Sequence, residues 1–484
     1  MRSLLSAFFF ALAALACSDS LGPGSGPVTL SVISGNRQIG WQHTALLQPV
    51  VVEVVRKNGQ PLAGARLTVF TPGGSGRVID ADSVTDERGR FQFRWELGEG
   101  YENRAVVSLF EDQGSDAVAW ARARYLYRVP EETGDEWETA SLAAMGTDLE
   151  PLSALMDSLR AGHYQEVHSV VIVKGGRLVF EEYFPGHDFG YSSPGFLGTY
   201  LDFDRNTRHN THSATKSVVS ALVGVAIDQG LIPSEEDGVF TFFPEYASLN
   251  IGGKDGITIR DLLTMSSGLE WHEWDAPVGG GQNDIDAFNS SGDHIHYVLG
   301  RPLVHEPGTV FNYNGGTVNV LCQIVARAAG MGIDGFADQH LFGPLGITNY
   351  TFSRLFDGFI ACHGDIYITP RDMAKFGSLY LTQGEWQGRR ILSEEWVQKS
   401  VAPTVSLLPW HLSWADDYGY LWWMKDYYVR GRTYTAFKAM GWGGQEIVVF
   451  PEQDMVVVFT GANYSQDPPC DEMLMRFILP ALEG

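Results

Sequence analysis

The chain has little cysteine and little positive charge. It contains four cysteines, and 58 acidic residues outweigh 34 Lys and Arg, which gives a net charge of −24. A surface this acidic argues against binding nucleic acid or anionic lipid through the protein's own charge. The sequence also lacks a zinc-like cysteine spacing, a His-Glu-x-x-His motif and a Gly-x-Ser-x-Gly elbow. It therefore offers no motif of a zinc protease or an α/β-hydrolase, and we expect neither a metal nor an organic cofactor.

Long apolar runs are also absent, apart from the first residues. Residues 1–17 have a positive start at Arg2 and an apolar stretch from Leu4 to Leu15, which predicts a signal peptide too short to span a bilayer. Cys17 at the cleavage point resembles the lipobox of bacterial lipoproteins, which implies an exported, lipid-anchored protein of the periplasm or cell envelope. Ser18 favours the outer membrane in a cell with two membranes. The alternative is an ordinary signal peptide that is cleaved nearby.

Three cysteines remain if Cys17 carries the anchor. An exported protein meets oxidising conditions, so one disulfide is expected, with one thiol left over. Cys322 lies in a helical apolar pattern, which predicts a buried thiol. We therefore expect the bridge between Cys362 and Cys470.

A flexible Gly, Ser and Pro rich tether at residues 18–27 precedes an all-β region at residues 28–127. Short strands such as Val50–Val55 and Phe91–Trp95, separated by turn signals, indicate a β-sandwich. The phrases NGQPLAGARLTVF and TDERGRFQFRWELG resemble bacterial Ig-like modules of surface proteins. That resemblance implies a spacer or adhesion role, with a possible surface partner.

An acidic stretch at residues 128–150 predicts a linker to a second domain at residues 151–484. That domain has a hairpin pattern near each end, around Gly175 and around Pro451, with helical patterns between them. Strands at both ends with helices between indicate an α+β domain, an antiparallel sheet flanked by a helical region. The expected fold is thus multidomain, an Ig-like sandwich followed by an α+β unit.

The first chemical motif is His212-Ser213-Ala214-Thr215-Lys216, at the start of an apolar helical pattern. Ser213 and Lys216 are three residues apart and so share one face of a helix. The positive field of a helix N-terminus favours a developing alkoxide, and a desolvated lysine there can accept the serine's proton. The alternative is a helix cap with a nearby lysine.

Two further motifs follow along the chain. Tyr313, before Gly315 and Gly316, can serve as a second proton carrier beside Lys216, although most tyrosines are packed aromatics. The run from Gly441 to Gln445, GWGGQ, lets a strand approach a ligand closely. A backbone N–H from this run, with that of Ser213, would form an oxyanion hole.

In this order, the three motifs resemble those of the penicillin-recognising serine hydrolases, which include class C β-lactamases, DD-peptidases, related esterases and 6-aminohexanoate-dimer hydrolases. Supporting phrases are ITIRDLLTMSSGLEW, HEPGTVFNYNGG, PLGI and ITPRDMAKFG. The resemblance implies a β-lactamase/transpeptidase-like fold with Ser213 as the acylated nucleophile, Lys216 as its base and Tyr313 as the second proton carrier. It implies oxyanion or substrate contacts from the set Gly441, Trp442, Gly444, Gln445 and Asn314.

Two departures narrow the branch. Gly315 stands where the β-lactamase pattern Tyr-x-Asn has asparagine, and Asn314 is one residue off in register. Ala439 stands where the pattern Lys-Thr-Gly has lysine, and Lys438, one residue early, falls on the opposite face of a strand. The cation for a penicillin carboxylate is therefore missing, which favours the 6-aminohexanoate-dimer hydrolase and esterase branch, acting on small esters and linear amides.

Other interpretations stay open. A β-lactamase or DD-peptidase is the first alternative, and a surface binding protein with a vestigial hydrolase domain is the second. Asp293, His294 and His296 offer metal-ligand chemistry, but surface histidines are the commoner case. Trp422 and Trp423 are expected in the core.

Overall fold

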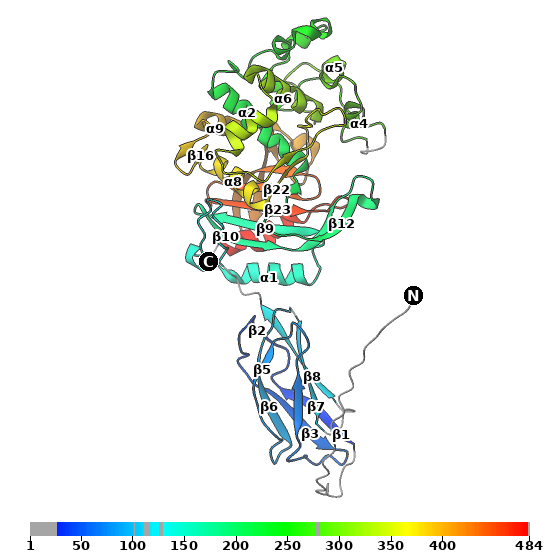
Figure 1. Ribbon diagram of the computed structural model, residues 1–484, viewed down its shortest axis with the longest axis vertical. Coiled ribbons are helices and arrows are strands. Elements are labelled where there is room, and N and C mark those ends of the chain that lie inside the picture. The colour runs from blue at the N-terminus through cyan, green and yellow to red at the C-terminus, as the bar shows by residue number, and fades with distance from the viewer. Residues whose placement is uncertain (1–26, 101, 111–115, 125–128, 277–280, 483–484) are drawn as a thin grey trace, which may run out of the picture. The chain divides into compact units, whose positions relative to one another are not determined.

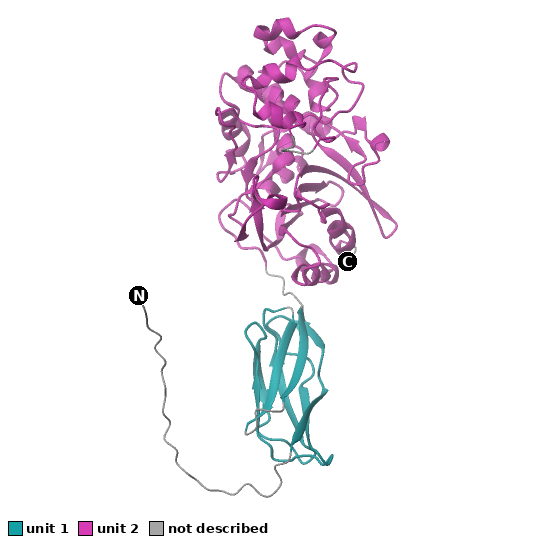
Figure 2. Ribbon diagram, turned by 90° about the vertical axis from the view of Figure 1, so that its right-hand side faces the viewer, with its two compact units in different colours: residues 1–126 teal, residues 127–484 magenta. Residues whose placement is uncertain are grey.

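The computed structural model describes residues 27–484 except 101, 111–115, 125–128, 277–280 and 483–484. The expected signal peptide, Cys17 and almost all of the tether lie outside the described residues. The chain divides into two compact units, Met1–Leu126 and Tyr127–Gly484, drawn in teal and magenta in Figure 2.

The first unit consists of two four-stranded sheets that share one apolar core. Their strand orders are β1-β3-β6-β5 and β2-β8-β7-β4, and every pairing is antiparallel except β2 with β8. In β6 the side chains of Phe91, Phe93 and Trp95 are buried and alternate with exposed residues, as expected of a strand with one face on a core. The strands are β1 Val28–Ser34, β2 Gln38–Trp41, β3 Val50–Arg56, β4 Leu67–Phe70, β5 Arg77–Ala81, β6 Arg90–Glu96, β7 Glu102–Leu109 and β8 Asp116–Arg124.

The second unit is built on an eight-stranded antiparallel sheet of order β10-β9-β23-β22-β21-β20-β19-β18. Its central strands are continuous apolar runs because helices cover both faces: α8 packs on β9, β22 and β23, while α1 lies on the other side of the sheet (Figure 1). The strands are β9 Val167–Lys174, β10 Arg177–Tyr183, β18 Val405–Ser406, β19 Asp417–Tyr418, β20 Trp423–Val429, β21 Arg432–Gly441, β22 Gln445–Phe450 and β23 Met455–Gly461.

A helical region lies between the two hairpins, as the sequence predicts. Its central helix α2 is buried along nearly its whole length and packs against α6. Thr258 and Asp261 form a capping box at the start of α3. The helices of this unit are α1 Leu149–Arg160, α2 Thr215–Asp228, α3 Ile259–Leu263, α4 Asp284–Asn289, α5 His294–Gly300, α6 Gly315–Ala329, α7 Ile333–Ala337, α8 Pro370–Leu381, α9 Glu394–Ser400, α10 Cys470–Met473 and α11 Leu479–Ala481.

Three small sheets complete the unit. The pair β11–β12 is a hairpin, β13-β15-β14 adjoins the start of α2, and β16–β17 follows α8. Their strands are β11 Pro185–Phe189, β12 Leu197–Asp202, β13 His209–Asn210, β14 Thr351–Phe352, β15 Ile366–Ile368, β16 Glu385–Trp386 and β17 Arg389–Arg390. No single helix of the described chain is long and apolar enough to cross a membrane; only α6 taken with Ile333–Phe342, bent by 76°, meets the length and composition.

The acidic stretch that we expected to be a linker is packed against the second unit. Trp137 is buried in the unit's core. Asp135 forms a 2.8 Å ion pair with Arg371 of α8, and the side chain of Arg371 also pairs with Glu181. The described part of residues 128–150 therefore belongs to the second unit, because its aromatic and acidic side chains have partners there.

Candidate active site

Ser213 and Lys216 meet at the start of the buried helix α2. Ser213 lies in the short 3₁₀ turn η3 (His212–Ala214), and Lys216 follows in the first turn of α2. Lys216 Nζ lies 2.8 Å from Ser213 Oγ and donates a second hydrogen bond to the carbonyl oxygen of His363. Within the described chain, no carboxylate lies at ion-pair distance from Lys216. Its ammonium group is thus held by a hydroxyl and a carbonyl, a geometry that suits proton exchange with Ser213.

Tyr313 lies beside this pair. Its side chain is buried, and Lys216 Nζ lies 4.9 Å from the centre of its ring. The residue just precedes α6, whose first turn is capped by Asn314. The structure therefore brings Ser213, Lys216 and Tyr313 together, as the sequence predicts.

The end of strand β21 lies directly against the turn that carries Ser213. A Cβ on Gly441 would lie 2.0 Å from the carbonyl oxygen of Thr211 and 3.2 Å from the amide nitrogen of Ala214. Only glycine permits this backbone approach. The indole of Trp442 is held by a 3.0 Å hydrogen bond to the carbonyl of Tyr464. The close approach of Gly441 places the backbone N–H of the next residue, Trp442, beside the turn that carries Ser213. An oxyanion hole requires a donor at this position.

Three polar residues near these motifs have structural partners. Asn314, expected among the substrate contacts, is buried and caps α6, accepting a 3.0 Å hydrogen bond from Thr317 N–H. Gln445, also expected there, is buried and ties β22 to the carbonyl of Gly461. Lys438 is fully buried and pairs with Asp471 at 2.8 Å. The Oδ1 atom of Asn314 and the side-chain amide of Gln445 therefore bond backbone groups, whereas the buried Nδ2 of Asn314 has no hydrogen-bond partner within the described residues.

Gly443 and Gly444 of the GWGGQ run have backbone conformations that explain why glycine stands at both positions. Gly443 and Gly444 have φ angles of +84° and +91°, which favour glycine. A Cβ on Gly443 would lie 2.3 Å from the ring of Tyr464. We expected Gly444 among the substrate contacts. Its positive φ angle explains why glycine stands at this position.

Glu273 is a site residue that sequence reasoning missed. Its Oε2 accepts a 2.7 Å hydrogen bond from Gly315 N–H and a 2.8 Å bond from Trp271 Nε1. A Cβ on Gly315 would meet this oxygen and the Cβ of His363, both at 3.0 Å. Glu273 thus fills the space beside the position where the family pattern has asparagine. Burial raises the pKa of Glu273, and the charge of Lys216 opposes that shift.

His212 and Asp365 form a second unpredicted pair next to the nucleophile. His212 has a φ of 44°, and its Nδ1 lies 3.5 Å from Asp365 Oδ1, which also accepts a 2.7 Å hydrogen bond from Asn210 Nδ2. Burial alone would raise the pKa of Asp365, but the interaction with His212 holds it well below its usual range. The contact between His212 and Asp365 holds the turn before Ser213 in a conformation that costs energy for a non-glycine residue.

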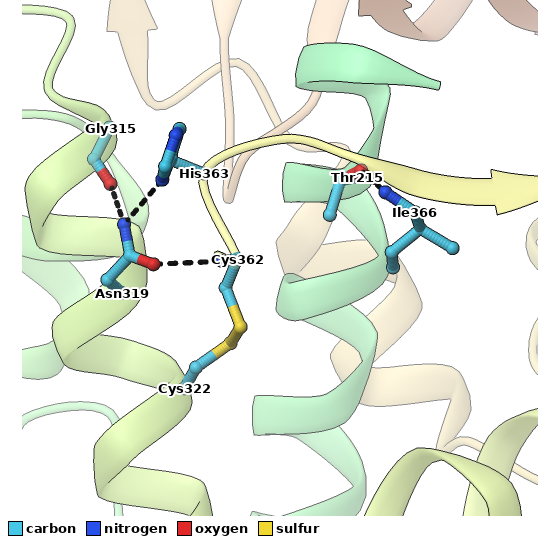
Figure 3. Close-up of a disulfide and its surroundings, with 7 residues drawn as sticks. All are labelled: Thr215, Gly315, Asn319, Cys322, Cys362, His363 and Ile366. Atoms are coloured by element: carbon cyan, nitrogen blue, oxygen red, sulfur yellow. Dashed lines mark hydrogen bonds between the residues drawn. A yellow bond between two sulfur atoms is a disulfide. The ribbon is translucent and has the colours of Figure 1, made fainter. Parts of the chain in front are cut away.

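The disulfide joins α6 to the loop that holds Lys216 (Figure 3). Cys322 of α6 is bonded to Cys362, and Cys470 is a buried free thiol. Our expectation of a bridge between Cys362 and Cys470 is therefore wrong. A helical apolar pattern places Cys322 in the interior, but burial does not prevent pairing when a loop crosses the same face of the helix. Cys470 instead packs near Gly444.

Asn319 supports the same loop. Its Oδ1 accepts a 2.8 Å hydrogen bond from Cys362 N–H, and its Nδ2 donates to Gly315 O and to His363 Nδ1 at 2.9 and 3.0 Å (Figure 3). Burial lowers the pKa of His363 to about 4, so the ring is neutral at pH 7 and accepts the hydrogen bond from Asn319. These bonds hold the loop in the position in which the carbonyl oxygen of His363 accepts a hydrogen bond from Lys216.

The histidine-rich segment at residues 293–296 has structural roles. Asp293 caps α5, and His294, which we expected at the surface, is buried between Phe288 O and Asp357. Within the described residues, no group of three or more His, Cys, Asp or Glu is placed to hold a metal ion. Trp422 and Trp423 are buried in the core, as predicted.

Comparisons with known proteins agree with this fold. Residues 152–478 match the family model described as Beta-lactamase. The chain is 25% identical over 291 residues to 6-aminohexanoate-dimer hydrolase of Paenarthrobacter ureafaciens, covering 58% of this chain and 69% of the relative. A putative 6-aminohexanoate-dimer hydrolase from Bacillus anthracis is similar in structure, with a TM-score of 0.53 and 20% identity over 69% of this chain and 81% of that one. A family VIII carboxylesterase has a TM-score of 0.53 and 18% identity over 69% and 96% of the two chains.

The fold and the family match define the second unit as a serine hydrolase. The chain belongs to the Beta-lactamase family, because that model covers more than half of it.

Proposed function

We propose that the protein hydrolyses small esters or linear amides through an acyl-enzyme on Ser213. The observation that carries this proposal is the 2.8 Å distance between Lys216 Nζ and Ser213 Oγ, with Tyr313 beside them and strand β21 against the nucleophile turn. The relatives named for amide and carboxylester chemistry support the same reaction class.

In this mechanism Ser213 Oγ attacks the substrate carbonyl carbon, and its proton passes to Lys216 and Tyr313. The carbonyl oxygen becomes an oxyanion between the N–H groups of Ser213 and Trp442, which are fixed donors that need no reorganisation during the reaction. As the bond to the leaving oxygen or nitrogen breaks, Tyr313 returns a proton to that atom. Water then attacks the acyl-enzyme, the same groups take its proton, and Ser213 is restored.

Linear substrates are favoured over β-lactams because the expected carboxylate anchor is absent. Lys438 is buried and paired with Asp471 and Glu446, so it offers no cation to a penicillin carboxylate. Ala439 stands at the motif position, and it is also buried. The first alternative function is that of a β-lactamase or DD-peptidase. The second alternative is a surface binding protein whose hydrolase domain is vestigial.

We further propose that the N-terminal unit is an Ig-like spacer or adhesion module and that Cys17 carries a lipid anchor. The two four-stranded sheets with one core support the first part. The composition of residues 1–17 supports the second. Metabolic labelling with a radioactive fatty acid, compared with a Cys17→Ser variant, tests the anchor: label that persists in the variant would contradict it.

The test of the activity uses protein lacking residues 1–17, incubated with p-nitrophenyl acetate and butyrate and separately with nitrocefin. We expect ester turnover that disappears in Ser213→Ala, with little nitrocefin hydrolysis. Fast Ser213-dependent nitrocefin turnover would support the β-lactamase rival. Ester turnover that persists in Ser213→Ala would overturn the proposal.

A further inference from the structure

The ring of Tyr313 is the innermost part of a larger aromatic surface. Trp274 stacks on it with ring centres 4.7 Å apart and an interplanar angle of 19°, and Trp423 stacks at 5.8 Å and 23°. Lys216 Nζ lies 4.9 Å from the centre of the same ring. Tyr313, one of the two proposed proton carriers, is therefore in direct contact with two tryptophan rings.

Further aromatic residues from separate segments extend this surface. Trp414 contacts Trp423 at 4.8 Å and Trp274 at 5.9 Å between ring centres. Phe311 contacts Trp423 at 6.2 Å and Trp410, in the turn η8 (Leu408–Trp410), at 5.8 Å. We call these five residues, Trp274, Phe311, Trp410, Trp414 and Trp423, the aromatic wall.

The aromatic wall has buried backing and exposed tips. Trp423 and Phe311 are 5% and 4% exposed, whereas Trp274 and Trp410 are 46% and 45% exposed. Large aromatic rings left in water next to a reaction centre usually mark a binding surface, since a folded chain otherwise buries them. The buried rings hold the two exposed rings in place, so the surface is ready for a ligand without ordering costs.

The position of Tyr313 decides which part of a substrate meets this wall. The hydroxyl of Tyr313 hands its proton to the leaving atom, so groups stacked on its ring lie beside the leaving group. The Oε2 atom of the neighbouring Glu273 accepts hydrogen bonds from Gly315 N–H and Trp271 Nε1, and the five residues of the wall carry no charged group. The wall itself therefore offers faces of aromatic rings, which recognise flat apolar groups.

We propose that the aromatic wall binds an aromatic leaving group of the ester or amide substrate, stacked on Trp274 and Trp410. This inference rests on the proposed hydrolase function and names the substrate class of its site. It assigns the preference to the leaving alcohol or amine rather than to the acyl group.

The test compares benzyl acetate with ethyl acetate, whose leaving alcohols have similar acidity. Both substrates form the same acetyl-enzyme, so a difference in kcat/KM reports the step in which the leaving group departs. In the wild-type protein we expect a clear preference for benzyl acetate. In Trp274→Ala and in Trp410→Ala the benzyl-to-ethyl ratio should fall about tenfold, the scale of one lost aromatic contact with its buried area.

Tyr428→Ala serves as the matched control because Tyr428 is an exposed aromatic residue at the far end of the strand that begins with Trp423. Its ratio should equal that of the wild type. Trp410 touches Phe311 rather than Tyr313, so its variant leaves the proton carrier's own contacts in place.

A second pair of substrates, ethyl phenylacetate and ethyl acetate, places the aromatic ring on the acyl side. The wall variants should leave this ratio unchanged. An unchanged benzyl-to-ethyl ratio in both wall variants, or a fall confined to the phenylacetate pair, would overturn the inference. Failure of the hydrolase proposal looks different, since Ser213→Ala would then retain whatever turnover the wild type shows.

Discussion

Gly441 lies against Thr211 so closely that a single methyl group cannot be added between them. A Cβ on Gly441 would stand 2.0 Å from the carbonyl oxygen of Thr211. This contact sets the spacing between the strand that ends at Gly441 and the turn that carries Ser213. The proposed oxyanion donors lie on the two sides of it.

Gly441→Ala should therefore lower kcat about 100-fold, the effect of losing one oxyanion donor. The methyl group forces the strand away from the turn and carries Trp442 N–H with it. The measurement is steady-state turnover of p-nitrophenyl acetate. Gly335→Ala is the control, because a Cβ on Gly335 meets nothing within 4 Å; equal activity of the two variants would contradict the prediction.

Glu273→Gln should make the acidic limb of the kcat/KM profile shallower, because it removes a buried carboxyl group that titrates beside Lys216. Burial raises the pKa of Glu273 and Lys216 opposes the shift, so the two charges interact. The variant lacks the proton that Glu273 binds in the wild type as the pH falls, which is the reason for the shallower limb. Glutamine can still accept both hydrogen bonds from Gly315 and Trp271.

The control for this profile is Asp275→Asn, a change of charge on the same loop at an exposed residue paired with His272. It should leave the acidic limb in place. A Glu273→Gln profile that coincides with the wild type would reduce Glu273 to a support for the start of α6.

Breaking the disulfide should cost both stability and activity. Cys322 and Cys362 are 40 residues apart, and closing a loop of that length stabilises the folded chain by about 4 kcal/mol in the chain-entropy model. The freed loop also carries the His363 carbonyl that holds Lys216. We expect Cys322→Ser to lower both Tm and kcat.

The matched change is Cys470→Ser, which removes a thiol that forms no bridge. A reductant should lower the Tm of this variant by the same amount as it lowers the Tm of the wild type. If reductant left the Tm of the wild type unchanged, the bridge would contribute nothing to the folded state.

His209 should make the folded protein sensitive to acid. Burial lowers its pKa to about 3, below the ordinary value of about 6.5. Its contribution to stability is therefore complete above pH 6.5 and is lost as the pH falls toward 3, because the unfolded chain binds a proton that the folded chain refuses. One such proton corresponds to about 1.4 kcal/mol per pH unit.

The free energy of unfolding, measured in urea between pH 7 and pH 4, tests this. The slope of the unfolding free energy against pH should become shallower in His209→Gln, by up to about 1.4 kcal/mol per pH unit. A variant with an unaltered slope would show that other groups set the acid sensitivity.

The catalytic motif and the hairpins could be predicted from the sequence because both are local. Ser213 and Lys216 are three residues apart on one helical turn, and the strands around Gly175 and Pro451 are each joined by a short turn. Helical periodicity and turn residues encode such features directly.

The remaining features depend on contacts between distant segments. Glu273 and Gly315 are 42 residues apart, and nothing in either local sequence announces the contact. The carbonyl of His363 is a backbone group, which any residue type would supply. Cys362 pairs with Cys322 rather than with Cys470 because the loop that carries Cys362 crosses α6. The pattern of buried residues in the sequence could not show which segment crosses that helix.

Acylation of Ser213 is the central step of the proposed reaction. The protein, mixed with p-nitrophenyl acetate and quenched in acid within its first turnovers, is digested and analysed by peptide mass spectrometry, alongside Ser213→Ala and Lys216→Ala. We predict one acetyl group on the peptide that contains Ser213 in the wild type, none in Ser213→Ala, and slow appearance in Lys216→Ala. An acetyl group on another residue, with equal rates of appearance in all three proteins, would contradict the proposed mechanism.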